Sequence, residues 1–121
     1  MDMESLFIIG RISLGTLAIV AGLSHFFRIG ALGRMLKSSK IPFGRQLVFL
    51  TGVALILAGL GVAFWLYIEE SLWFLMGFFV AVSLFVHRFW SKKGTERLTD
   101  MRLFLWNMML AGLLVLTLAV L

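Results

Sequence analysis

Four side chains that could take part in chemistry lie within otherwise apolar stretches of the chain: His25, His87, Trp90 and Asn107. An imidazole exchanges protons near neutral pH, an asparagine amide donates and accepts hydrogen bonds, and an indole provides a flat apolar wall. If the stretches are helices that alternate in direction, the four residues reach a similar depth. They would then line a pocket for a quinone headgroup, which needs hydrogen-bond donors for its carbonyl oxygens.

Other interpretations of this group stay open. Two imidazoles can ligate haem b between helices, but both histidines lie near the ends of their stretches, which disfavours haem. The simplest alternative is that lipid headgroups solvate the histidines while Asn107 bonds between helices. No metal is expected, because no carboxylate accompanies the histidines at this depth. The sequence contains no self-contained catalytic constellation, so an enzymatic role is left open between none and an oxidoreductase subunit.

Arg11 is a charged residue inside the first apolar stretch. A buried guanidinium is costly in hydrocarbon and needs a partner. One interpretation is a structural ion pair with Glu4, Glu69 or Glu70. The other is a site for an anion or a lipid headgroup.

These residues must be positioned by four apolar stretches, residues 5–27, 46–68, 71–90 and 103–121. The chain has 121 residues, 61% of them hydrophobic and only 14% charged, whereas about a quarter of a soluble domain is charged. A membrane-spanning helix needs roughly 20 apolar residues. The sequence therefore predicts one transmembrane domain over residues 1–121, an all-α antiparallel four-helix bundle. Residues 31–38 are expected to form a short interfacial helix, and Glu69 and Glu70 the turn between the second and third spans.

The basic residues indicate how the bundle is oriented. Ten of the 11 lysines and arginines lie in residues 28–45 and 88–102, and the net charge is +5. Because cytoplasmic loops carry an excess of basic residues, loops 28–45 and 91–102 are expected in the cytoplasm. Both termini then lie on the non-cytoplasmic side of the cell (inner) membrane. The charge is thereby explained by orientation and contact with membrane lipids, and no nucleic-acid partner is expected.

Small residues predict where helices pack, since close backbone approach drives association in lipid. Gly52 and Gly59 stand seven apart in the second stretch, and free small-residue faces of this kind would suit a homodimer. In the first stretch, one face repeats at spacings of four, three, four and three residues: Arg11, Gly15, Ala18, Gly22 and His25.

Several motifs resemble the DoxX family of small four-helix membrane proteins. The first stretch is similar to the family's Arg-x-x-Leu-Gly opening and its later Ala-Gly-x-x-His/Lys. Further similarities cover nearly the whole chain in the same order. The matching segments are Arg11-Ile-Ser-Leu14-Gly15, Ala21-Gly22-Leu23-Ser24-His25, Lys40-Ile41-Pro42, Leu50-Thr51-Gly52, His87-Arg88-Phe89-Trp90, Phe104-Leu-Trp-Asn107 and Ala111-Gly112-Leu113-Leu114.

The resemblance implies a four-helix membrane fold. Some family members are associated with membrane redox complexes, including quinol oxidase and thiosulfate:quinone oxidoreductase subunits, so it also implies redox-complex subunits as partners. Many members carry a glutamate shortly after the second-helix glycine, where this chain has Val53, Ala54 and Leu55. Two alternatives remain: a non-catalytic scaffold or assembly factor that works through glycine-rich faces, and a carrier of small solutes or lipids. A carrier would need a polar path from Arg11 to His25.

Overall fold

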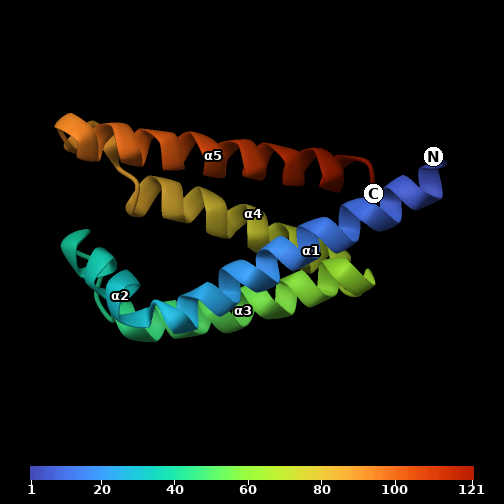
Figure 1. The fold of residues 1–121 in the computed structure, drawn as a ribbon, viewed down its shortest axis with the longest axis horizontal. Helices are drawn as coiled ribbons and strands as arrows, with labels where there is room; N and C mark the ends of the chain where they lie inside the picture. Colours follow the sequence, from blue (N-terminus) through green and yellow to red (C-terminus); the bar gives the residue numbers. More distant parts are fainter. The chain divides into compact units, whose positions relative to one another are not determined.

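The computed structural model describes residues 1–121, and the chain is helical almost throughout. It forms two compact units, Met1–Leu72 and Trp73–Leu121. The all-α prediction is confirmed (Figure 1). The elements are α1 (Met3–Phe27), α2 (Ile29–Ser38), α3 (Gly44–Phe64), α4 (Ile68–Phe85), the 3-10 helix η1 (Phe89–Ser91) and α5 (Gly94–Ala119).

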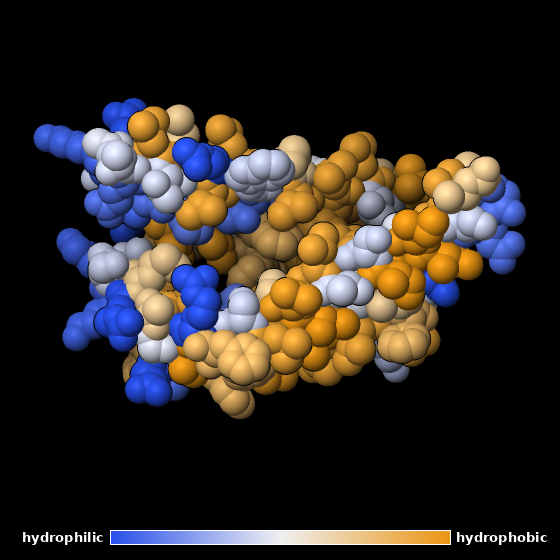
Figure 2. Space-filling model, in the orientation of Figure 1, coloured by the Kyte–Doolittle hydropathy of each residue, from blue (hydrophilic) through white to orange (hydrophobic).

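Four helices, α1, α3, α4 and α5, are long and apolar enough to cross a membrane. Apolar side chains cover the middle of these helices, and hydrophilic ones gather toward their ends (Figure 2). Large aliphatic side chains stand exposed along them, for example Leu17 at 64%, Leu57 at 63% and Leu116 at 65%. Exposure of this kind is costly in water and ordinary in lipid, so the helices have the surface of a membrane protein.

The ends of the observed helices differ from the ends of the predicted spans. The turn after α3 comes at residues 65–67, and Glu69 and Glu70 lie in the first turn of α4, where carboxylates interact favourably with the helix dipole. Helix α4 ends at Phe85 rather than at residue 90, and α5 begins at Gly94 rather than at residue 103. The expected short helix over residues 31–38 is confirmed as α2, which begins two residues earlier, at Ile29.

The first helix starts at a side-chain cap. The Asp2 carboxylate accepts a hydrogen bond from the Ser5 backbone N–H at 2.8 Å, and Glu4 follows in the first turn. This bond lowers the pKa of the exposed Asp2 carboxyl, because it favours the ionised form. The N-terminal end of α1 is therefore both capped and acidic.

Helices α1 and α3 pack with their backbones in contact. A Cβ atom added to Gly15 would lie 2.6 Å from the Gly59 carbonyl oxygen, and one added to Gly22 would lie 2.6 Å from the Gly52 oxygen. The higher-numbered residue of α1 meets the lower-numbered residue of α3, so the two helices run antiparallel. Gly15, Ala18 and Gly22 are buried, which confirms that the small-residue face of the first helix is a helix interface.

A second glycine contact fixes the bend between α2 and α3. A Cβ on Gly44, the first residue of α3, would lie 2.8 Å from the Gly33 carbonyl oxygen of α2. The stem of Arg45 also packs here, because a Cβ on Gly33 would lie 3.1 Å from the Arg45 Cγ. The short helix is thus held close to the start of α3.

The turn between α3 and α4 holds two non-glycine residues in the left-handed region, Trp65 at φ 58° and Tyr67 at φ 49°. Such backbone costs of order 1–3 kcal/mol per residue and needs support from its surroundings. The Leu66 N–H donates to the Gly61 carbonyl oxygen at 2.8 Å, which closes the end of α3. The Phe7 ring of α1 meets the Trp65 ring edge-on at 4.5 Å between centroids. These contacts compensate the strained turn.

We expect the glycine contact to make Gly22 intolerant of even one added methyl group. Gly22→Ala should lower the free energy of unfolding in detergent by about 1–3 kcal/mol, because backbone must move to admit the Cβ. Gly10 on the same helix has nothing within 4 Å of such a Cβ, so Gly10→Ala is the matched control and should be neutral or gain up to about 1 kcal/mol. Denaturant titration of the purified variants measures both, and equal effects would contradict the contact.

Candidate functional site

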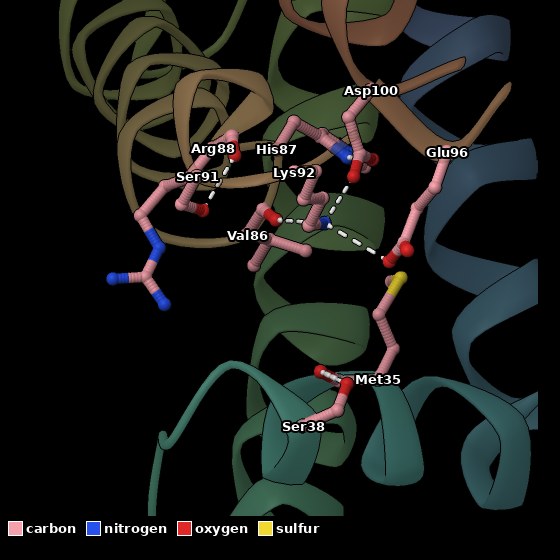
Figure 3. Close-up of polar contacts among 9 residues, drawn as sticks. All are labelled: Met35, Ser38, Val86, His87, Arg88, Ser91, Lys92, Glu96 and Asp100. Atoms are coloured by element: carbon pink, nitrogen blue, oxygen red, sulfur yellow. Dashed lines mark hydrogen bonds and ion pairs between the residues drawn. The ribbon is translucent and has the colours of Figure 1, made fainter. Parts of the chain in front are cut away.

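A buried histidine–carboxylate pair joins the segment after α4 to α5 (Figure 3). His87 Nδ1 lies 2.9 Å from Asp100 Oδ1. The His87 side chain is 9% exposed and that of Asp100 is 12% exposed. Because an ionised carboxylate only accepts hydrogen bonds, the ring donates through its Nδ1–H. The other nitrogen, Nε2, is then left to accept a proton or, once protonated, to donate one.

Lys92 places a positive charge next to the negatively charged Asp100 carboxylate. Its ammonium donates to the second oxygen of Asp100, Oδ2. It also lies 3.4 Å from the Val86 carbonyl oxygen and 4.0 Å from Glu96 Oε1 (Figure 3). With donors on both oxygens, the Asp100 carboxylate is neutralised and fixed in orientation. A carboxylate held in this way keeps the imidazole in one tautomer.

Local backbone structure brings the three side chains together. At the end of α4 the His87 N–H donates to the Val82 carbonyl oxygen at 3.1 Å, one residue further back than a regular α-helical bond. The 3-10 turn η1 then reverses the chain, and Gly94 opens α5 at φ 64°, a conformation favoured by glycine. Asp100 therefore lies in a helix that folds back beside η1.

An aromatic cluster stands beside the polar group. Phe89, Trp90 and Phe104 meet edge-on, with centroid distances of 5.3 Å from Phe89 to Trp90, 5.3 Å from Phe89 to Phe104, and 5.9 Å from Trp90 to Phe104. Trp90 is 52% exposed. The rings supply flat apolar walls within a few residues of His87 and Asp100.

Another polar atom of α4 is buried without a partner. Ser83 is 0% exposed, and its Oγ makes no hydrogen bond. A serine in an apolar helix commonly bonds the carbonyl one turn back, as Ser24 does to Ala21 in α1. Ser83 lies in the last turn of α4, four residues before His87. Its hydroxyl group is therefore available to donate a hydrogen bond.

The sequence-predicted site residues fall in both units. His25 is in α1, where its Nδ1 lies 2.8 Å from the Ala21 carbonyl oxygen of its own helix. His87 and Trp90 lie together after α4, at the polar group and the aromatic cluster respectively. Asn107 is on α5, seven residues after Asp100 and so on the same helix face, about 10 Å along the axis. The second unit thus holds three of the four predicted residues.

Arg11 is half-buried and makes no ion pair with Glu4, Glu69 or Glu70. Its guanidinium carbon is 5.5 Å from the centroid of the Phe7 ring, one turn toward the N-terminus. Its Nε is buried and has no hydrogen-bond partner. The charged guanidinium therefore contacts an aromatic ring and no carboxylate.

Sequence reasoning missed Asp100, Lys92 and Ser83. The expectation that no carboxylate accompanies the histidines is wrong for His87, because α5 begins at Gly94 and carries Asp100 inside the helix. A signal existed: Asp100, Phe104 and Asn107 recur at spacings of four and three residues, continuing to Ala111 and Leu114. That periodicity extends the buried face of the helix back to the carboxylate.

Comparison with known proteins adds no assignment. No protein-family model matches the chain, and no curated protein and no solved structure is significantly similar to it.

We expect Asp100 to be the stabilising member of the polar group. Asp100→Ala leaves His87 and Lys92 without their acceptor and should lower the free energy of unfolding by about 2–4 kcal/mol. Glu96→Ala is the matched control one turn away, since Glu96 is 72% exposed in its pair with Lys92 and should change stability by at most about 0.5 kcal/mol. Equal losses in denaturant titrations would contradict the assignment.

For Arg11, in contrast to Asp100, we expect substitution to change stability little. Because it has no carboxylate partner within the chain, Arg11→Leu should alter the free energy of unfolding by no more than about 1 kcal/mol, the scale of the lost cation–π contact. The measurement is the same titration in detergent. A loss above about 3 kcal/mol would instead reveal an internal ion pair.

Proposed function

We propose that α1, α3, α4 and α5 form an antiparallel transmembrane bundle in the cell (inner) membrane, with both termini on the non-cytoplasmic side. The length and apolar composition of the four helices support the proposal that they span the membrane. The concentration of basic residues in residues 28–45 and 88–102 supports the orientation. The proposed DoxX-like membership rests on the sequence motifs.

Within that frame, we propose that the chain is a small membrane subunit of a quinone-linked redox complex and binds the quinone headgroup at His87. The observation that carries the proposal is the His87–Asp100 hydrogen bond of 2.9 Å, because it leaves Nε2 as a proton-exchanging atom of fixed orientation. A quinol that is oxidised to a quinone loses two protons and two electrons. One hydroxyl proton passes to Nε2 and the second passes to water at the membrane surface. Both electrons pass to a redox group of a partner subunit.

The surroundings of His87 fit a quinone headgroup. The Asp100 carboxylate, bonded to Nδ1, stabilises the imidazolium that forms when Nε2 takes the proton, and Lys92 holds that carboxylate in place. The unpaired Ser83 hydroxyl, four residues before His87, is a donor for a quinone carbonyl oxygen. Trp90 and its neighbouring rings supply the apolar wall. Asn107, on the same face of α5 as Asp100, is proposed as an additional member of the pocket.

The test uses the full-length chain purified in detergent and a short-tailed ubiquinone analogue, with binding followed by quenching of tryptophan fluorescence. His87→Asn should weaken binding by about 10-fold or more, the scale of one lost hydrogen bond to a charged group. Ser83→Ala should weaken it less, and Trp90→Phe should reduce the quenching amplitude. Stability of each variant is measured in parallel.

His25→Asn is the matched control, because His25 bonds to the carbonyl of its own helix. It should weaken binding by clearly less than His87→Asn. No saturable binding by the wild-type chain, or unchanged binding in His87→Asn, would overturn the quinone proposal and favour the scaffold. Equal losses in both histidine variants would contradict His87 as the proton-exchanging residue.

A further inference from the structure

A groove lies at the bend where α2 meets the first turns of α3. It has a volume of about 500 Å³ and is lined by Ile29, Arg45, Gln46, Phe49 and Leu50. The groove is open to its surroundings rather than enclosed. All five residues belong to the first unit, and the groove is remote in sequence from His87 and Asp100.

The groove has one apolar and one polar end. Phe49 and Leu50 stand one turn further along α3 than Arg45 and Gln46, and Ile29 faces them from the start of α2. The Phe49 ring is held edge-on by Phe26 of α1, at 5.4 Å between centroids. The Arg45 stem packs against Gly33 of α2. Both the aromatic wall and the cationic end are therefore positioned by neighbouring helices.

The positive charge of the residues around the groove indicates which kind of ligand it binds. Residues 28–45 carry five basic side chains and no acidic one, so Arg45 has no carboxylate partner in this segment and enters no ion pair. The free N–H groups in the first turn of α3 add to the positive potential, since that helix has no side-chain cap. An anion with an apolar tail fits both ends at once.

We propose that the groove binds an anionic phospholipid from the bilayer leaflet at this end of the helices. Its phosphate contacts the Arg45 guanidinium and the Gln46 amide, and one acyl chain lies over Ile29, Phe49 and Leu50. Amphipathic α2, with Arg34 and Lys37 beside its apolar residues, lies in the headgroup region and carries the rest of the surface charge. This site is independent of the proposed quinone function.

Native mass spectrometry of the full-length chain, with phosphatidylglycerol or phosphatidylcholine added at equal concentration, tests the proposal. The wild type should retain one phosphatidylglycerol in clear preference to phosphatidylcholine. Arg45→Gln should reduce that retention about fivefold, the scale of one surface cation acting on an anionic lipid. Leu50→Ala should reduce it about threefold through lost apolar contact.

Two matched controls separate the groove from general basic and apolar surface. Arg97→Gln removes an exposed cation of α5, and Leu57→Ala removes a leucine of α3 that is 63% exposed, close to the 60% of Leu50. Both should retain phosphatidylglycerol as the wild type does. Equal loss in Arg45→Gln and Arg97→Gln would overturn the site, as would equal retention of the two lipids. Displacement of phosphatidylglycerol by inorganic phosphate or by a ubiquinone analogue at the same concentration would also overturn it.

Discussion

The backbone contact between α1 and α3 is the constraint on which the first unit depends. In hydrocarbon an apolar helix gains little by burying more apolar surface, so association relies on close packing. At Gly15–Gly59 and Gly22–Gly52 the two backbones approach until no Cβ atom fits between them. That approach sets the register of the pair. It brings Phe7 to the strained turn at Trp65 and His25 to Gly52, and it leaves α2 to pack on the start of α3.

The second unit is organised by electrostatics where α4 is followed by α5. A carboxylate as buried as Asp100 requires donors on its oxygens, and His87 and Lys92 supply them. Both donors come from the segment that links α4 to α5, so the same bonds that neutralise the charge also fix the chain reversal. Removing the acid would leave two donors unsatisfied, whereas its exposed neighbour Glu96 contributes little to this arrangement.

The sequence predicted the parts of the fold that depend on periodicity. The spacing of Gly15, Ala18 and Gly22 identified a helix interface before its partner helix was known, because three- and four-residue steps stay on one helix face. Helix ends were less predictable. Residues 94–102 are mostly polar, so their hydropathy resembles that of a loop. Five of the nine nonetheless have a high helix propensity: Glu96, Arg97, Leu98, Met101 and Arg102. The omission of Asp100 from the site followed directly from that boundary, and the αL turn at Trp65 carries no glycine to mark it.

The positions of the polar groups bear on which functions the chain can serve. A carrier would need a continuous polar path along α1 from Arg11 to His25. Gly15 and Gly22 lie between those residues, and at both of them the α1 backbone is in contact with α3. The contact leaves no room for a solute along this helix pair. The α2–α3 groove and the His87 group instead lie at helix ends. A ligand can reach the α2–α3 groove without crossing the packed middle of the α1–α3 pair.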